Sequence, residues 1–111
     1  MNMKLIMAVI HDDDAHRLMQ ALNQGGFSVT KLASTGGFLR SGNTTVFLGV
    51  DPERVDAALA IIEKECKSRR QMTPANHPYA NVAEGYIPYP VEVTVGGATI
   101  FVVDVEQFKK I

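Results

Sequence analysis

The segment TTVFLGVDPERVDAALAIIEKEC, Thr44–Cys66, combines two hydrophobic patterns in one short stretch. Its first part, Thr44–Val50, is rich in β-branched and aromatic residues, which favours a strand. Asp51 then stands at a helix N-cap position and Pro52 in the first turn. Apolar side chains follow at helical spacing on one stripe: Val55, Ala58, Leu59, Ile62 and Cys66. The segment predicts a strand followed by a helix that covers one face of a sheet.

The N-terminal part of the chain repeats this order. Lys4–Ile10 (KLIMAVI) is a compact apolar run with the length of a buried strand. Asp12–Asp14 bring N-cap oxygens and negative charge to the start of a helix, and Gly25–Gly26 end it. The apolar stripe of this helix consists of Ala15, Leu18, Met19 and Leu22.

The remaining segments predict further strands and one long loop. Phe27–Ala33 reads as the second strand. Lys67–Pro88 has no periodicity and is too long for a simple connector, so we expect a loop that contains at most short strands. Val91–Val103 contains two apolar runs around Gly96–Gly97, a pair typical of a hairpin turn. Asp104–Phe108 is expected to form one helical turn capped by its aspartate.

The order of these elements is β-α-β, β-α-β with an additional C-terminal strand. We therefore predict an α+β protein with a ferredoxin-like βαββαβ sandwich, in which two helices cover one face of the sheet. The other face needs a cover, which neighbouring subunits supply most simply, so a homo-oligomer is expected.

Composition restricts the classes of function. The chain has 111 residues and 46% hydrophobic residues, enough for one domain with a single core. Eleven Lys and Arg against twelve Asp and Glu give a formal charge of −1, so neither polymeric DNA or RNA nor an anionic membrane is an expected partner. The single Cys66 and the short N-terminal apolar run predict a cytoplasmic protein.

The segment Gly37–Thr44 (GFLRSGNT) differs from a phosphate-binding P-loop by one residue. Asn43 stands where that loop has lysine, and a strand rather than a helix follows, so we exclude a nucleoside triphosphatase. Glycine amides still form a nest for phosphate, and an asparagine amide reads a base edge. Phe38 and Leu39 offer an apolar platform for a base. A glycine-rich hairpin without a ligand explains the same spacing equally well.

Other polar clusters have simpler explanations. His11–His16 (HDDDAH) contains metal-ligand residue types, but its place at a helix start indicates acidic capping, and no metal is predicted. Cys66 is expected to be a small core residue. Lys67, Arg69 and Arg70 are typical of a solvated helix end, although they also suit contact with a phosphate or a partner. The chain shows no acid and base pair on rigid elements, so no catalytic residue and no enzyme are predicted.

Three segments resemble a known family across nearly the whole chain: TKLASTGGFLRSGNTT (Thr30–Thr45), GYIPYPVEVTVGGAT (Gly85–Thr99) and FVV (Phe101–Val103). They are similar to the PII-like cyclic di-AMP receptors known as PstA or DarA. The resemblance implies a single PII-like domain over 1–111, a homotrimer, and cyclic di-AMP in each of three clefts between subunits. It implies a short T-loop at 34–42, an enlarged B-loop at 67–88, and neither catalysis nor a further cofactor.

The resemblance also implies the ligand-binding residues, which are Thr30, Gly36, Gly37, Phe38, Leu39, Asn43, Gly49 and Phe101. Thr30 and the glycine amides would bind phosphate, Asn43 the adenine edge, and Phe38 and Leu39 the base. Gly26 and Ser28 depart from the residues of some family members, which Lys31 or Arg40 would compensate. The downstream partner is not identified. Two alternatives are a trimeric metal-binding protein of the divalent-cation-tolerance type and a scaffolding module without a small ligand.

Overall fold

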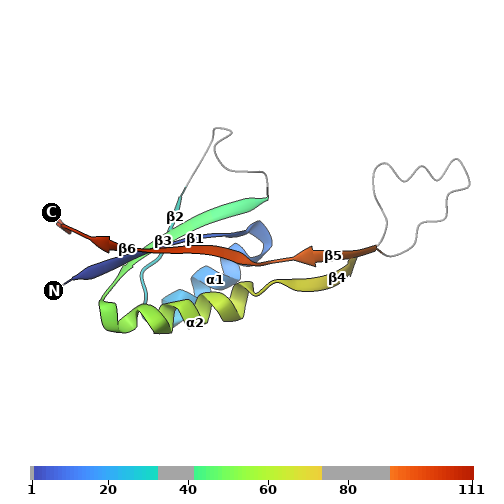
Figure 1. Ribbon diagram of the computed structural model, residues 1–111, viewed down its shortest axis with the longest axis horizontal. Helices are drawn as coiled ribbons and strands as arrows, with labels where there is room; N and C mark the ends of the chain where they lie inside the picture. The colour runs from blue at the N-terminus through green and yellow to red at the C-terminus, as the bar shows by residue number, and fades with distance from the viewer. Residues whose placement is uncertain (1, 33–41, 74–90) are drawn as a thin grey trace, which may run out of the picture.

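Two layers form the body of the protein, a four-stranded sheet and two helices on one of its faces (Figure 1). The computed structural model describes residues 2–32, 42–73 and 91–111. The elements in chain order are β1 (Met3–His11), α1 (Asp12–Gln24), β2 (Thr30–Leu32), β3 (Asn43–Val50), the 3₁₀ turn η1 (Pro52–Arg54), α2 (Val55–Cys66), β4 (Arg69–Thr73), β5 (Val91–Val95) and β6 (Ala98–Val105). Neither described helix is long and apolar enough to cross a membrane.

The sheet has the strand order β2-β3-β1-β6, and its described pairs are antiparallel. With α1 between β1 and β2 and α2 between β3 and β6, this order matches the predicted ferredoxin-like βαββαβ arrangement. The central strand β1 pairs with β3 on one side and with β6 on the other. Ile6, for example, lies opposite Leu48 and Val102.

The core lies between the sheet and the helices. Alternate side chains of β1 and β3, such as Ile6 and Leu48, point to the helices, because successive strand residues face opposite sides of a sheet. They pack against the buried stripes of the helices, and these stripes agree with the predicted ones. The buried helix residues are Asp14, Ala15, Leu18 and Leu22 in α1 and Ala58, Ile62 and Cys66 in α2.

The second strand is shorter than predicted because Phe27 closes the preceding helix. The Phe27 amide donates to the Leu22 carbonyl at 2.9 Å, and Gly26 has a φ of +85°, which together end α1 in a Schellman-like turn. The Phe27 ring is buried, with the Arg54 guanidinium 4.1 Å from its centroid. Its backbone is therefore used in the cap, and the ladder begins at Thr30.

The helix starts also differ from the prediction in their caps. In α1 the N-cap residue is His11, whose Nδ1 accepts from the Asp13 amide at 3.4 Å. Asp12 instead accepts a hydrogen bond from the Thr44 hydroxyl, which ties the helix start to β3. Asp51 caps η1 through its backbone carbonyl, with no hydrogen bond from its side chain.

The predicted Gly96–Gly97 hairpin is wrong. β5 pairs with β4, whereas β6 pairs with β1, so the two glycines carry the chain from one sheet into the other. Their φ angles of +79° and +92° permit this passage between the two sheets. The Gly97 amide donates to the Cys66 carbonyl at the end of α2. In Figure 1, β5 and β6 follow one another along one line.

The additional strands precede the last strand of the sheet, so the predicted C-terminal extra strand is also wrong. β4 and β5 form a two-stranded ribbon that projects from the body (Figure 1). The predicted loop 67–88 thus begins with strand β4, and its residues 74–88 lie outside the described residues. The expected helical turn at Asp104 is absent from the described C-terminal segment, because β6 continues to Val105.

We expect Ile62→Ala to lower the free energy of unfolding by about 2–5 kcal/mol, since it removes buried methylenes and leaves a cavity. Ile62 is 0% exposed. Ile61→Ala is the matched control, because the neighbouring isoleucine is only partly buried and its loss should be clearly smaller. Denaturant unfolding measures both, and equal losses would contradict the described core.

Candidate ligand-binding site

The face of the sheet opposite the helices carries apolar side chains that no other described element covers. Leu32, Phe101 and Val103 on this face have exposed fractions of 37%, 55% and 46%. Strand pairing assigns them to this face, because directly opposed residues in antiparallel strands point to the same side. We call this surface the open face.

One row of side chains crosses the open face from edge to edge. Thr30 of β2 lies opposite Phe47, Phe47 opposite Met7, and Met7 opposite Phe101 of β6. With strands about 4.8 Å apart, three steps separate the row's ends by about 14 Å. The two predicted binding residues Thr30 and Phe101 therefore share a face but lie at opposite edges of the sheet.

The other two described candidates lie at the ends of β3. Asn43 is opposite His11, and Gly49 is opposite Leu5, again on the open face. Six residues separate them along the strand, or about 20 Å at a rise of about 3.3 Å per residue. The structure thus brings four predicted residues onto one face, but it does not gather them into one pocket within the chain.

The predicted residues Gly36, Gly37, Phe38 and Leu39 lie outside the described residues. The end of their loop is placed, because the Asp12 amide donates to the Gly42 carbonyl at 2.8 Å. Gly42 has a φ of +95°, a conformation that favours glycine. The loop therefore joins β3 beside the start of α1 and directly before Asn43.

A hollow of about 260 Å³ lies beside Asn43, where β1 ends and β6 begins. Its lining residues are Val9, Ile10, His11, Asn43, Gly96, Gly97, Ala98 and Thr99. Sequence analysis missed the approach of Gly96–Gly97 to Asn43, because the pair was assigned to a hairpin. Both glycines line the hollow with Asn43, and their positive φ angles are the feature that distinguishes this place from an ordinary strand.

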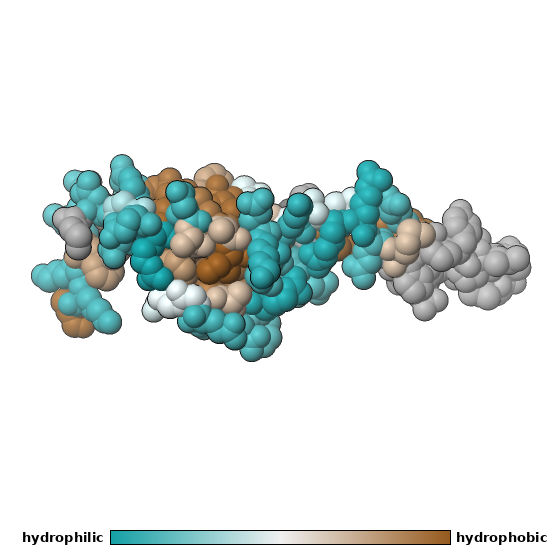
Figure 2. Space-filling model, turned by 90° about the horizontal axis from the view of Figure 1, so that it is seen from below, coloured by the Kyte–Doolittle hydropathy of each residue, from teal (hydrophilic) through white to brown (hydrophobic). Residues whose placement is uncertain are grey.

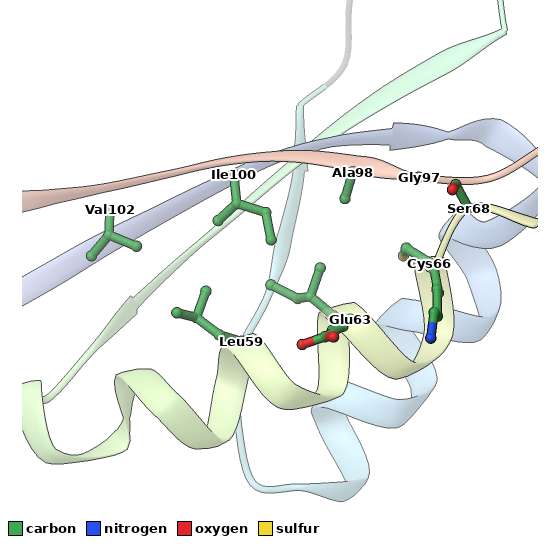
Figure 3. Close-up of a pocket in the computed structure, with 10 residues that line it drawn as sticks. Leu59, Glu63, Cys66, Ser68, Gly97, Ala98, Ile100 and Val102 are labelled. Carbon is green, nitrogen blue, oxygen red and sulfur yellow. The ribbon is translucent and has the colours of Figure 1, made fainter.

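A second cavity, of about 610 Å³, separates α2 from the edge strand β6 (Figure 3). Leu59 on α2 and Ile100 and Val102 on β6 point into it. Val102 is 41% exposed, although it lies on the helix side of the sheet. The edge strand β6 therefore presents apolar side chains on both of its faces.

Cys66 lines the same cavity at the end of α2 and is 1% exposed, as predicted for a small core residue. Burial, and next the negative charge of Asp14, raise the pKa of this thiol from 9.0 to about 11. The thiolate is the nucleophilic form of cysteine, so this side chain is held in its unreactive state.

Asp14 is the one charged side chain that is fully buried in the described part of the chain. Its Oδ1 accepts from Arg17 Nη2 at 2.8 Å and from Arg69 Nη2 at 3.0 Å. Burial alone would raise the pKa of Asp14, but the hydrogen bond and charge of Arg69, and then those of Arg17, hold it below its usual value. The ion pairs thus stabilise the fold above about pH 4 and lose this contribution on acidification.

These pairs correct the prediction of a solvated basic helix end. Arg69 and Arg70 belong to β4, and each is bound to a carboxylate: Arg69 to Asp14, and Arg70 to Glu92 at 2.6 Å. The hollow of about 540 Å³ at the base of the ribbon is lined by Arg17, Lys64, Glu65, Lys67, Ser68 and Arg69. The surface around this base is largely hydrophilic, whereas apolar side chains show over the body (Figure 2).

The residues described by the structure contain no group of three or more His, Cys, Asp or Glu placed to hold a metal ion. Three polar residues of HDDDAH have other partners. His11 caps α1, Asp12 accepts from Thr44, and Asp14 binds two arginines.

The family model of the cyclic-di-AMP receptor matches residues 3–111. The chain belongs to the cyclic-di-AMP receptor family. A crystal structure of a functionally unknown protein from Pediococcus pentosaceus ATCC 25745 shares 39% sequence identity with this receptor-family chain. The match covers 100% of this chain and 99% of that one, with a TM-score of 0.76.

This receptor-family chain is also similar in fold to a PII protein. The B. subtilis GlnK–ATP complex matches it with 17% identity over 94% of this chain and 82% of that chain, at a TM-score of 0.56. At this identity the likeness shows the fold alone. The predicted resemblance to PII-like cyclic di-AMP receptors is therefore confirmed.

Alkylation should test the state of Cys66. At pH 8, the two-unit rise in pKa lowers the thiolate fraction about a hundredfold, and burial slows access further. We expect native protein to react with iodoacetamide more than a hundredfold more slowly than protein unfolded in denaturant, which is the internal control. Labelling at similar rates in both states would contradict the buried position.

Proposed function

We propose that this protein is a cytoplasmic signal receptor that binds cyclic di-AMP in clefts between the subunits of a homotrimer. It relays occupancy to a partner by rearranging its loops and performs no catalysis. The family match over residues 3–111 carries this proposal. The strand arrangement supports it, because the candidate residues Thr30 and Phe101 lie at opposite edges of the sheet, where a neighbouring copy would complete a cleft.

The edge strand β6 supports the assembly. Phe101 and Val103 are exposed on the open face, and Val102 is exposed beside the cavity on the helix side. An apolar edge strand without cover is a site of uncontrolled association, so a stable soluble protein needs a defined partner there. A second copy is that partner in our proposal, since it also covers the continuous apolar surface of the open face.

The two edges of the sheet support a cyclic assembly. A copy whose β2 edge meets the β6 edge of the next forms a heterologous contact, and such contacts close into rings when the rotation allows it. In this ring Thr30 of one copy approaches Phe101 of its neighbour. The distance of about 14 Å between them within one chain is then no obstacle to a shared ligand.

The residue types suit a cyclic dinucleotide. The Thr30 hydroxyl and the amides of Gly36 and Gly37 would donate to phosphate oxygens, while Asn43 reads an adenine edge. Phe38, Leu39 and Phe101 would contact the bases, and Gly49 would admit the ligand by lacking a side chain. The similar GlnK was solved with ATP, so a protein of this fold accommodates an adenine nucleotide.

The relay is assigned to the two loops. The T-loop, 34–42, ends directly before Asn43, and the B-loop, 67–88, includes β4 at the base of the ribbon. A ligand shifts a loop equilibrium only when it contacts the alternative states differently. The T-loop ends beside Asn43, and the B-loop begins beside Gly96–Gly97. A ligand held by Asn43 would therefore have access to both loops. The downstream partner is not identified by this chemistry.

We expect a particle of three times the chain mass of 12.1 kDa in light scattering at micromolar concentration. Val103→Asp should shift this particle to smaller species, because it places a charge on the open face. Thr94→Asp is the control, since Thr94 is an exposed residue of the ribbon and its variant should keep the wild-type mass. A monomeric wild type would contradict the trimer and the cleft together.

Asn43→Ala should weaken cyclic di-AMP binding about tenfold or more, because an unpaired adenine group in a desolvated cleft costs about 1–3 kcal/mol. Asn23→Ala is the matched control, since Asn23 is an exposed asparagine of α1. Calorimetric titration with cyclic di-AMP, cyclic di-GMP and ATP measures affinity and selectivity. Absence of cyclic di-AMP binding by the wild type would reject the proposed function in favour of a metal-binding or scaffolding protein.

A further inference from the structure

Asp14 and Arg69 lie next to Gly96, one of the two glycines that line the hollow with Asn43. A Cβ atom added to Gly96 would come within 2.6 Å of Arg69 Nη1 and 3.3 Å of Asp14 Oδ2. The Gly96 backbone therefore lies against the ion pair with no room for a side chain. The same Gly96 lines the hollow that contains Asn43. Gly96 thus lies between the candidate ligand hollow and the pair of the buried Asp14 with the partly exposed Arg69.

The contacts around this residue connect four elements. Asp14 belongs to α1, and Arg69 is the first residue of β4. Arg69 Nη1 also donates to the Lys67 carbonyl at 3.3 Å, and the Gly97 amide donates to the Cys66 carbonyl at the end of α2. The place where β5 passes into β6 is consequently held against both helices and against the ribbon.

The ion pair has few alternative arrangements. Asp14 is 0% exposed, so separation from Arg69 would leave a buried carboxylate with Arg17 as its remaining partner. Removing one partner of a buried pair is strongly unfavourable. By contrast, the Arg70–Glu92 pair on the same ribbon has exposed fractions of 77% and 52%, and water replaces its contacts easily.

We propose that Asp14 and Arg69 are positioning residues for the ligand hollow. Neither residue lines the hollow. Together they hold the Gly96–Gly97 backbone at a set distance from Asn43 and so determine the affinity for cyclic di-AMP. Through Arg69 they also join the base of the ribbon to the hollow. This inference rests on the proposed function, because Asn43, which lines the hollow, is proposed there to read an adenine edge.

The first test is Asp14→Asn, which removes the charge and nearly preserves the side-chain shape. We expect cyclic di-AMP affinity to fall about tenfold, and amide hydrogen exchange at Gly96 and Gly97 in the ligand-free protein to accelerate at least tenfold. Glu92→Gln is the matched control, because it removes the carboxylate of the exposed pair on the ribbon. That variant should keep wild-type affinity and exchange.

A second pair of variants keeps the test decisive if Asp14→Asn does not fold. Arg69→Gln alone and the double variant D14N/R69Q should show the same two effects, and the double variant should lose little more affinity than either single one. Wild-type affinity and exchange in a folded variant would overturn the inference. A wild type that binds no cyclic di-AMP would reject the proposed function, while the exchange measurement would still decide the positioning role.

Discussion

The pairing of β1 with β3 on one side and β6 on the other determines where the candidate residues of those two strands lie. β1 pairs with β3 from Lys4↔Val50 to His11↔Asn43, and with β6 from Met3↔Val105 to Ile10↔Ala98. Because side chains alternate between faces, a slip of one residue would turn the buried side chains of β1 outward. The buried positions of this strand therefore fix its register, and the register places Asn43 beside the end of β1 and Phe101 beside Met7.

The sheet has helices on one face only, and the described residues leave the other face uncovered. The helix side buries a core in which Ile6, Leu18 and Ile62 are fully enclosed, whereas the open face keeps Phe101 more than half exposed. The edge strand adds to this asymmetry, because its apolar residues point to both sides. The proposed assembly and the proposed ligand binding both use this same uncovered surface.

The sequence predicted those parts of the fold that depend on local periodicity. The stripes of both helices follow from apolar spacing of about 3.6 residues. The strand at Lys4–Ile10 follows from a short apolar run and the strand at Thr44–Val50 from β-branched and aromatic residues. The Gly96–Gly97 turn was misassigned because local sequence shows only that the chain changes direction. The pairing of β5 with β4 joins residues that are 18 to 26 positions apart.

The candidate site, like the fold, was predicted from the sequence only in part. Residue type indicated the amide of Asn43, and the family resemblance indicated Phe101. The structure assigns both to the open face. Sequence did not indicate that Asp14 accepts from Arg69, since the two are 55 positions apart and acidic residues at a helix start have a common local explanation. Their contact depends on tertiary packing, because α2 packs against α1 and Arg69 follows the end of α2 by three residues.

The Gly96–Gly97 connection between β5 and β6 also restricts how the proposed signal would pass through the molecule. β6 continues directly from β5 across Gly96–Gly97, and eight residue pairs then hold β6 to β1. A displacement of the ribbon cannot be absorbed inside β6 without breaking this ladder, so the two glycines with positive φ are the residues that accommodate it. Both glycines line the hollow beside Asn43. Motion of the ribbon and occupancy of the hollow would therefore act on the same two residues, which would give the proposed receptor a short physical route between ligand and partner.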